Sequence, residues 1–375
     1  MIRLPVEAPL TEHLYRRATE AGTPLSGTFE LSPLCNLNCR MCYVRMSADQ
    51  QRAIAPLANV EDWLSLAAKA AGEGMLYLLL TGGEPFAYPH FRELLAGLHK
   101  LGLLVSINTN GTLIDQQTVA WLKQTPPVRV NVTLYGGSED TYARLCGDGS
   151  GYTRAVNAAR LLTAAGIGVR INYTITPDNI ADLPAVIALA KELNVPIQPT
   201  AYLFPPVRRD ATAIGGGYRP TPEVAAYYTA LAEYYQYGKD AILNKSVEDA
   251  PIPTAEEDCA APAEGVRCRA GRCSFWVTWQ GNLMPCGMFP SEGAPNVFKT
   301  DFAAAWEQVK RETAAIRLPA ECATCGHKKL CHACAAMVIT ESGDFATPPA
   351  YRCEMTRAYP AALRQLQEKI KEQTL

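Results

Sequence analysis

The sequence predicts an α/β fold built on a parallel sheet, with a smaller cysteine-rich part after it. Over the first two hundred residues, short apolar and β-branched runs alternate with segments of helical period. Such βα alternation gives parallel strands joined by right-handed crossovers. A length of 375 residues is enough for two or three domains, and eight cysteines lie close together between Cys268 and Cys353.

Six strands and five intervening helices are expected in this first part of the chain. The strands are Thr28–Ser32, Leu76–Thr81, Leu103–Thr109, Val128–Leu134, Gly168–Thr174 and Ile197–Leu203. The helices are Val60–Glu73, Phe91–Lys100, Gln116–Lys123, Thr153–Ala165 and Ala181–Leu193. Six units are too few for a closed eight-stranded barrel.

Beyond the strands the pattern changes. A Pro- and Gly-rich loop is expected over Phe204–Tyr218, and Thr221-Pro222-Glu223 then has the composition of a helix start, with the helix reaching about Tyr237. Asn244–Asp258 is acidic, contains proline and lacks apolar periodicity, so it is expected to be a linker or a substrate-side loop. The segment Met355–Gln373 is helical in pattern and is expected to pack back on the barrel formed by the strands and helices.

Charge and composition exclude several classes of protein. The net charge is −2 with dispersed Lys and Arg, which argues against a nucleic-acid or anionic-membrane surface. The N-terminus lacks the features of a signal peptide and no stretch of about 18 apolar residues occurs, so a soluble cytoplasmic protein is expected. In that compartment thirteen cysteines favour metal binding over disulfides.

Three cysteines, Cys35, Cys39 and Cys42, directly follow the first expected strand. Three thiolates within eight residues can bind three corners of a [4Fe–4S] cube, which leaves the fourth iron open to another ligand. A zinc loop or three unrelated thiols is the alternative. The C-x3-C-x2-C spacing resembles that of the radical S-adenosylmethionine (radical SAM) enzymes, and the resemblance implies that SAM chelates the open iron through its amino and carboxylate groups.

A second run, Thr81-Gly82-Gly83-Glu84-Pro85, ends the second expected strand. It resembles the GGEP motif of the same family, although by itself it is also compatible with a simple turn. Glycines allow close approach of the backbone to a ligand, and a carboxylate accepts hydrogen bonds from an ammonium group. The resemblance therefore places Thr81, Gly82, Gly83 and Glu84 around the amino group of SAM.

The same resemblance implies a partial (β/α)6 barrel as the core. Ligands of parallel sheets lie at the C-terminal ends of the strands, where both motifs fall. The resemblance further implies that one electron would enter the cluster, that SAM would be cleaved to methionine and a 5′-deoxyadenosyl radical, and that this radical would abstract hydrogen from an unactivated carbon. The resemblance also implies SAM contacts at Asn108 or Asn110 and at Thr133, each of which could equally be an ordinary turn residue, at Met41 near the adenine, and at Arg144 against the SAM carboxylate.

The eight C-terminal cysteines resemble the SPASM extension, which carries two auxiliary [4Fe–4S] clusters. The opening Cys268-x12-Gly281-x4-Cys286 matches, whereas the last spacing before Cys334 is one residue shorter than usual. The resemblance assigns Cys268, Cys273, Cys286 and Cys334 to one cluster and Cys322, Cys325, Cys331 and Cys353 to the other. Two zinc sites are the alternative, disfavoured because zinc ribbons separate their cysteine pairs more widely. Electron transfer is the expected role, with a purely structural role as the alternative.

Two cysteines remain, Cys146 and Cys259. Either could donate a hydrogen atom to a substrate radical, as in peptide epimerases of this family, or be an inert small hydrophobe. No histidine triad or carboxylate pair suggests a hydrolase, and no catalytic acid or base is assigned.

The expected organisation is an N-terminal extension (1–27), a core (28–204), a bridging helix and linker (205–258), a SPASM-type domain (259–354) and a terminal helix (355–375). The expected substrate is a ribosomally made peptide that gains a thioether, carbon–carbon or related bond. Alternatives are a sulfatase-type maturase, a peptide epimerase and a radical dehydrogenase of a small molecule. A non-catalytic iron–sulfur carrier is disfavoured because it needs neither the GGEP run nor an open iron.

Expected partners are an electron donor such as flavodoxin or ferredoxin and the precursor peptide. About 27 residues precede the first strand, too few for the winged peptide-recognition domain of some relatives. Leader recognition is therefore expected at the barrel rim, at the linker or on a separate protein.

Overall fold

The sheet expected from the sequence is present and is larger than expected. A computed structural model describes residues 9–206, 218–246 and 265–373. Its eight strands follow the order β6-β5-β4-β3-β2-β1-β7-β8, and all neighbours pair in parallel except β7 and β8. The first six strands are β1 (Ser26–Glu30), β2 (Tyr77–Thr81), β3 (Leu104–Thr109), β4 (Arg129–Leu134), β5 (Val169–Thr174) and β6 (Ile197–Thr200).

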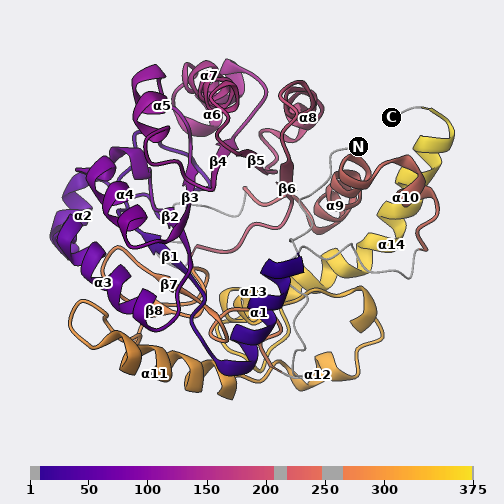
Figure 1. Cartoon of the computed structure of the whole chain (residues 1–375). Coiled ribbons are helices and arrows are strands. Elements are labelled where there is room, and N and C mark those ends of the chain that lie inside the picture. Colours follow the sequence, from indigo (N-terminus) through magenta and orange to yellow (C-terminus); the bar gives the residue numbers. More distant parts are fainter. Residues whose placement is uncertain (1–8, 207–217, 247–264, 374–375) are drawn as a thin grey trace.

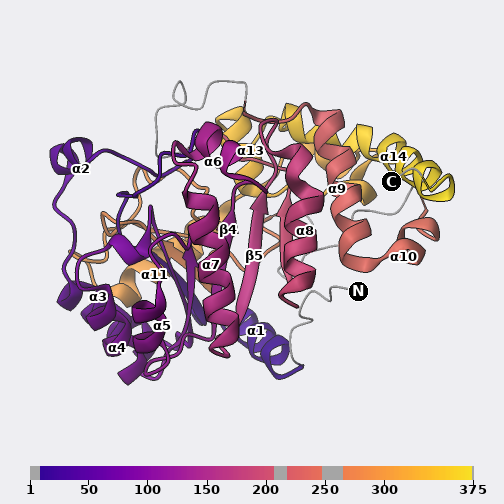
Figure 2. The same ribbon diagram turned by 90° about the horizontal axis from the view of Figure 1, so that it is seen from above.

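Helices cover the outer face of this curved sheet (Figures 1 and 2). They are α3 (Val60–Gly72), α4 (Phe91–Lys100), α5 (Gln116–Leu122), α6 (Glu139–Cys146), α7 (Gly151–Ala164) and α8 (Leu183–Glu192). Apolar residues of the strands face them: Phe29 packs on Trp63 with ring centroids 5.0 Å apart, and Val132 lies next to Ala158 beneath Gly111. The core of the molecule is this layer between strands and helices.

The opposite, inner face of the sheet is polar. Successive side chains of a strand point to opposite faces, so the neighbours of the buried valines on β4 point inward. The inward positions of β3, β4 and β5 are mostly polar: Leu104, Ser106, Asn108, Arg129, Asn131, Thr133, Arg170, Asn172 and Thr174. Parallel strands buried on both faces read as continuous apolar runs. The alternation seen here therefore marks an inner face that is separate from the apolar core.

The cysteine-rich part extends the same sheet, which the sequence interpretation did not anticipate. Strand β7 (Ser274–Val277) pairs with β1 in parallel, and β8 (Leu283–Met284) pairs with β7 in an antiparallel hairpin. Helix α11 (Phe302–Ala315) covers the outer face of β7, where the ring centroids of Phe302 and Phe275 lie 5.2 Å apart. The C-terminal part is thus joined to the core by a continuous sheet.

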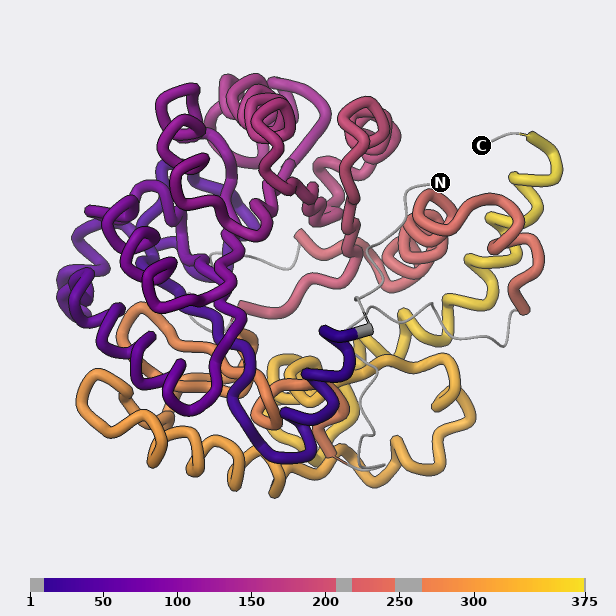
Figure 3. The backbone as a smooth tube through the Cα atoms, in the orientation of Figure 1, coloured from indigo at the N-terminus to yellow at the C-terminus, as the bar shows by residue number. Residues whose placement is uncertain are grey.

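Two long helices form a separate layer beside β6. Helix α9 (Pro222–Tyr237) begins at the expected Thr221 cap, and α14 (Ala350–Lys371) packs chiefly against it. The tube in Figure 3 shows the two helices running side by side, away from the outer helices of the sheet. The apolar residues of α14 belong to the same core cluster as those of the strands, with α9 as its main contact. Buried Glu233 joins the pair, accepting hydrogen bonds from Tyr359 Oη at 2.7 Å and Lys245 Nζ at 2.8 Å.

The remaining elements are short. They are the helices α1 (Pro9–Ala21), α2 (Ala48–Ile54), α10 (Lys239–Leu243), α12 (Ala320–Ala323) and α13 (Ala335–Ser342), and the 3₁₀ turns η1 (Pro85–Ala87), η2 (Ile180–Asp182) and η4 (Lys328–Leu330). Within the described residues no helix is long and apolar enough to cross a membrane. Most of the two predicted loops, Phe204–Tyr218 and Asn244–Asp258, and also Cys259, lie outside the described residues.

Candidate functional site

The three-cysteine loop follows the C-terminal end of β1. Cys39 is buried, and Cys35 and Cys42 are half-buried. The three thiols lie close enough to influence one another electrostatically: burial, with smaller contributions from Glu84 and the other two cysteines, raises the pKa of Cys35 to about 12. Backbone N–H groups point at the sulfurs, from Leu37 to Cys35 Sγ at 3.4 Å and from Arg45 to Cys42 Sγ at 3.3 Å. Such donors stabilise thiolates and the sulfur ligands of a cluster.

The end of α6 holds the middle of this loop in place. Asn38 N–H donates to Cys146 O at 2.9 Å, and Arg40 N–H donates to Leu145 O at 2.9 Å. Cys146 itself is fully buried, and its thiol hydrogen-bonds to Cys39. It therefore lies behind the cluster loop, packed in the core, and this placement favours the inert-hydrophobe alternative over hydrogen donation to a substrate.

The Gly82–Gly83 pair brings the end of β2 into backbone contact with the same loop. Gly83 N–H donates to Ser32 O at 2.6 Å, and Glu84 N–H donates to Leu34 O at 2.9 Å. A Cβ atom on Gly83 would lie 2.2 Å from Leu34 O, and Gly82 adopts a φ of +145°. Only glycine permits this approach, so the two sequence motifs meet in space.

Glu84 is buried at this junction. Its Oε1 accepts hydrogen bonds from Thr109 Oγ1 at 2.7 Å and from Phe86 N–H at 3.0 Å, and its Oε2 accepts from Asn110 N–H at 2.8 Å. These donors favour the carboxylate, but burial outweighs them and raises the pKa of Glu84 to about 7. A cationic ligand group would shift this balance toward the ionised form.

Asn110, rather than Asn108, reaches the cysteine loop. Its Nδ2 lies 3.6 Å from Cys35 Sγ and 3.0 Å from Asn36 Oδ1. Asn108 lies on the inner face of the sheet, where it accepts a hydrogen bond from Asn131 Nδ2 at 2.7 Å. Of the two alternatives that the sequence left open, Asn110 is the one next to the loop.

The other expected SAM contacts are more dispersed. Met41 is buried within the loop, and Thr133 points to the inner face of β4. Arg144 lies on α6, with its guanidinium 3.2 Å from Thr141 Oγ1. Their roles toward SAM remain predictions.

The C-terminal cysteines form two neighbourhoods. In one, Cys322, Cys325, Cys331 and Cys353 are close enough for their charges to interact: burial raises the pKa values of Cys322 and Cys353, and Cys325 and Cys331 add to both shifts. Thr356 Oγ1 lies 3.7 Å from Cys331 Sγ. These are the four residues expected to hold the second auxiliary cluster, and the fold brings them together from three segments of the chain.

In the other neighbourhood, Cys268, Cys286 and Cys334 border one small apolar cluster that includes Phe289. The fourth expected member, Cys273, is fully buried on the outer side of β7, with its Sγ 3.0 Å from Thr19 Oγ1 and in contact with apolar residues of α1. The structure thus gathers three of the expected four residues around that cluster.

Among the described residues, no three His, Cys, Asp or Glu side chains converge on a single metal-ion position. In a [4Fe–4S] cube each cysteine binds a different iron, so its ligands surround the cube without converging on one point. The cysteine loop next to β1 fits such a group because three thiols, several N–H donors and a glycine-lined approach occupy one place.

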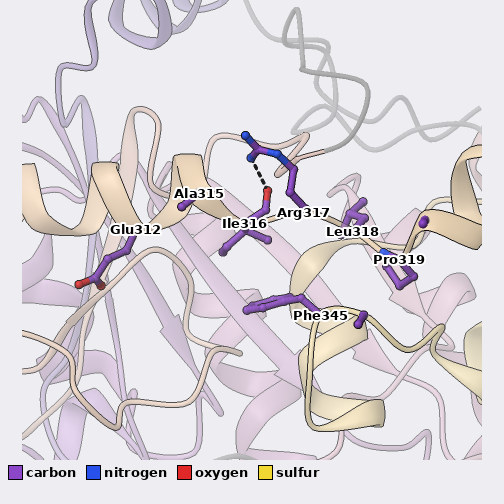
Figure 4. A pocket seen from close by; sticks show the side chains of 9 residues that line it. Glu312, Ala315, Ile316, Arg317, Leu318, Pro319 and Phe345 are labelled. Carbon is purple, nitrogen blue, oxygen red and sulfur yellow. Dashed lines mark hydrogen bonds between the residues drawn. The ribbon is translucent and has the colours of Figure 1, made fainter.

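A shallow pocket of about 540 Å³ lies at the end of α11 (Figure 4). Ile316, Leu318 and Phe345 form an apolar wall, and these side chains also pack on the cluster around Cys268, Cys286 and Cys334. The guanidinium of Arg317 is engaged with backbone carbonyls, including Ile316 O at 2.9 Å. This pocket is therefore a surface feature over the C-terminal cysteines and not the place of the SAM-type motifs.

The fold and the site together define an α/β partial barrel of parallel strands with a three-cysteine loop at the strand ends. Residues 29–190 match the Radical SAM superfamily. This part of the chain is a radical SAM domain, and it contains the cysteine loop and the Gly-Gly-Glu run.

Several known proteins are similar. The AdoMet-dependent heme synthase of Methanosarcina barkeri is 25% identical over 334 residues, which are 84% of this chain and 93% of that protein. The PqqA peptide cyclase of Gluconobacter oxydans is 30% identical over 171 residues, 46% of this chain and 47% of the cyclase. The crystal structure of Streptococcus suis SuiB bound to S-adenosylmethionine superposes with a TM-score of 0.66 and 19% identity, covering 92% of this chain and 84% of SuiB.

Proposed function

We propose that this enzyme uses SAM to modify a ribosomally made peptide. When bound, the cluster and SAM would supply a 5′-deoxyadenosyl radical; Cys35, Cys39 and Cys42 would hold the cluster, and Glu84 would accept hydrogen bonds from the SAM amino group. The observation that carries the SAM part is the backbone contact between the cysteine loop and Gly83, which brings the two SAM-type motifs together.

The peptide part rests on relatives. The PqqA cyclase is named for a peptide substrate, and a SuiB structure of the same fold as this chain is described as bound to its precursor peptide SuiA. We extend this substrate class to the present enzyme, with an electron donor of the flavodoxin or ferredoxin type and a cytoplasmic location. Leader recognition would fall to the sheet rim, the linker or a separate protein.

Two further [4Fe–4S] clusters belong to the proposal. Cys322, Cys325, Cys331 and Cys353 would hold one, and their mutual proximity supports it. Cys268, Cys286 and Cys334 would hold the other with Cys273, whose placement beside Thr19 supports that assignment least. The domain divisions at residues 204, 258 and 354 remain our proposal as well.

A second candidate is a radical reaction on a small molecule. It is favoured by the heme synthase of M. barkeri, which matches over most of both chains, whereas the peptide cyclase matches over about half of each. The two candidates differ in the substrate that supports turnover and not in the SAM chemistry.

The test is to incubate the reconstituted, reduced enzyme and SAM with short peptides encoded beside its gene, and to follow 5′-deoxyadenosine and peptide mass. A loss of about two mass units indicates oxidative bond formation. An unchanged mass with one deuterium gained in heavy water indicates epimerisation. If no such peptide is altered while a small metabolite supports turnover, the second candidate replaces the first.

A further inference from the structure

The inner face of the sheet carries a layer of polar side chains at the level of the SAM-type motifs. Strand register aligns them: Glu30 pairs with Thr81, Asn108 with Asn131, and Asn131 with Arg170. These side chains point inward because their neighbours along each strand pack against the outer helices. Arg170 therefore lies at the level of Glu30 and Thr81, but four strands away from β1, the strand that the cysteine loop follows.

A second arginine stands directly beneath this layer. Arg129 precedes Asn131 by two residues on β4, so it faces inward about 7 Å closer to the N-terminal ends of the strands. Its Nε donates to Asn131 Oδ1 at 2.9 Å, and Asn131 in turn donates to Asn108 Oδ1 at 2.7 Å. These bonds orient the guanidinium toward the layer above it.

Arg129 has no carboxylate partner among the described residues. Its one hydrogen bond goes to a neutral amide, and Glu30, the inner-face carboxylate of β1, accepts instead from Trp276 Nε1 at 3.3 Å. Arg129 is partly buried on β4, and this burial lowers the pKa of its guanidinium. A partly buried cation without an anion costs free energy, which an incoming anion recovers.

This cation is distinct from the groups proposed to bind SAM. Glu84, Gly83 and Asn110 lie around the loop that follows β1, at the ends of β2 and β3. Arg129 lies one layer deeper and on β4. A ligand bound to Arg129 would therefore occupy a place different from that of SAM.

We propose that Arg129, with Arg170 in the adjoining layer, binds a carboxylate group of the substrate. This deepens the proposed function by naming a chemical feature of the molecule that is modified. A guanidinium pairs with a carboxylate through two parallel N–H···O bonds, which fixes orientation as well as charge. An acidic peptide side chain and the carboxylates of a porphyrin share this chemistry, so the subsite accommodates either substrate candidate.

Binding measurements with matched acid and neutral probes test the proposal without turnover. One pair is coproporphyrin III and its neutral tetra-amide, followed by fluorescence. The other is the peptide amide Ser-Gly-Glu-Gly-Ser-Trp and its counterpart with Gln for Glu, followed by calorimetry. The full reconstituted enzyme is used as wild type and as the variants Arg129→Gln and Arg129→Lys, each at saturating SAM.

For at least one pair, we expect the wild type to bind the acid probe with a dissociation constant about tenfold lower than that of the neutral probe. Arg129→Gln should reduce the ratio of the two dissociation constants to near one. Arg129→Lys should retain part of the preference, because lysine keeps the positive charge but not the two parallel N–H donors of the guanidinium. Which pair shows the preference distinguishes the peptide from the small-molecule source. The dissociation constant of SAM should change less than threefold.

A stability measurement excludes a merely structural role. Among the described residues Arg129 has no carboxylate partner, so its partly buried charge reduces stability. Arg129→Gln removes this charge and should raise the melting temperature of the substrate-free enzyme by about 2–4 °C. The matched control is Arg160→Gln on the outer surface, where Arg160 pairs with Glu192 at 3.0 Å; it should leave both melting temperature and acid preference unchanged.

Three results would overturn the proposal: no acid preference in the wild type for either pair, an acid preference that survives Arg129→Gln, or a tenfold loss of SAM affinity in that variant. The last would mean that Arg129 holds the carboxylate of SAM itself. None of these results depends on whether 5′-deoxyadenosine is formed or a peptide is altered, so the proposed function stands or fails separately.

Discussion

Glu84 shows at the scale of one residue how burial and hydrogen bonding compete. Three donors hold its carboxylate, yet desolvation raises its pKa to about 7. The unfolded chain ionises the same group near pH 4.5. The folded state therefore binds this proton more tightly, and the group reduces stability progressively as pH rises from about 4.5 to about 7.

We predict a corresponding difference between wild type and Glu84→Gln in the metal-free protein. Relative to the variant, the wild type should lose on the order of 3 kcal/mol of unfolding free energy between pH 4.5 and 7 and change little above pH 7. Denaturant titrations of both proteins across this range measure the difference. Parallel pH profiles would show that Glu84 ionises normally in the folded state.

A second prediction at this scale concerns the cysteine loop. Replacing Cys35, Cys39 and Cys42 together with Ala should remove about four of an expected twelve irons per chain and all 5′-deoxyadenosine production. The matched control is Cys146→Ala, because Cys146 is buried beside Cys39; it should keep the iron and SAM cleavage. SAM cleavage by the triple variant would disprove the assignment of the catalytic cluster.

At the scale of elements, the glycine pair after β2 joins two loops through their backbones. Gly83→Ala would place a Cβ 2.2 Å from Leu34 O, so the cysteine loop must move away from β2. We predict a loss of about four irons per chain together with a lower melting temperature. Gly72→Ala is the control, since a Cβ on Gly72 meets nothing within 4 Å. Iron analysis and thermal unfolding of both variants measure these effects. Normal iron content in Gly83→Ala would show that the cysteine loop does not depend on the close approach at Gly83.

Elements with a strong sequence period were predictable from the sequence alone. Helix α4 (Phe91–Lys100) has the expected bounds, and β4 (Arg129–Leu134) differs from its prediction by one residue. Strands β7 and β8 were not predicted because they contain four and two residues, too few for an alternating pattern, and their place depends on pairing with β1. Similarly, sequence could not choose between Asn108 and Asn110, because only the turn after β3 decides which one reaches Cys35.

At the scale of the whole molecule, β7 and β8 join the cysteine-rich C-terminal part to the sheet whose strands β1 and β2 lead into the SAM-type motifs. If they hold auxiliary clusters, these act after hydrogen abstraction, because four protein ligands leave no open iron for SAM. Cys286→Ala or Cys325→Ala should then retain some SAM cleavage while abolishing or diverting product. Product analysis together with iron content measures this. Full turnover by a variant that has lost the corresponding cluster would reduce that cluster to a structural role.

The continuous sheet also predicts that the core is not independent of the C-terminal part. Pairing with β7 covers β1 from Ser26 to Phe29, and without it the edge of β1 is open to association with other chains. Loss of α14 would additionally expose the buried carboxylate of Glu233, which accepts from Tyr359.

A chain that ends at Ser246 should therefore aggregate and bind little iron, although it contains all the SAM-type motifs. A chain that ends at Lys371, the last residue of α14, should behave as the full-length protein. Size-exclusion chromatography and hydrogen exchange at Ser26–Phe29 compare the two. If the shorter chain is instead monomeric, protects these amides and cleaves SAM, the core folds without the C-terminal part. The C-terminal strands would then contribute to the reaction and not to the stability of the core.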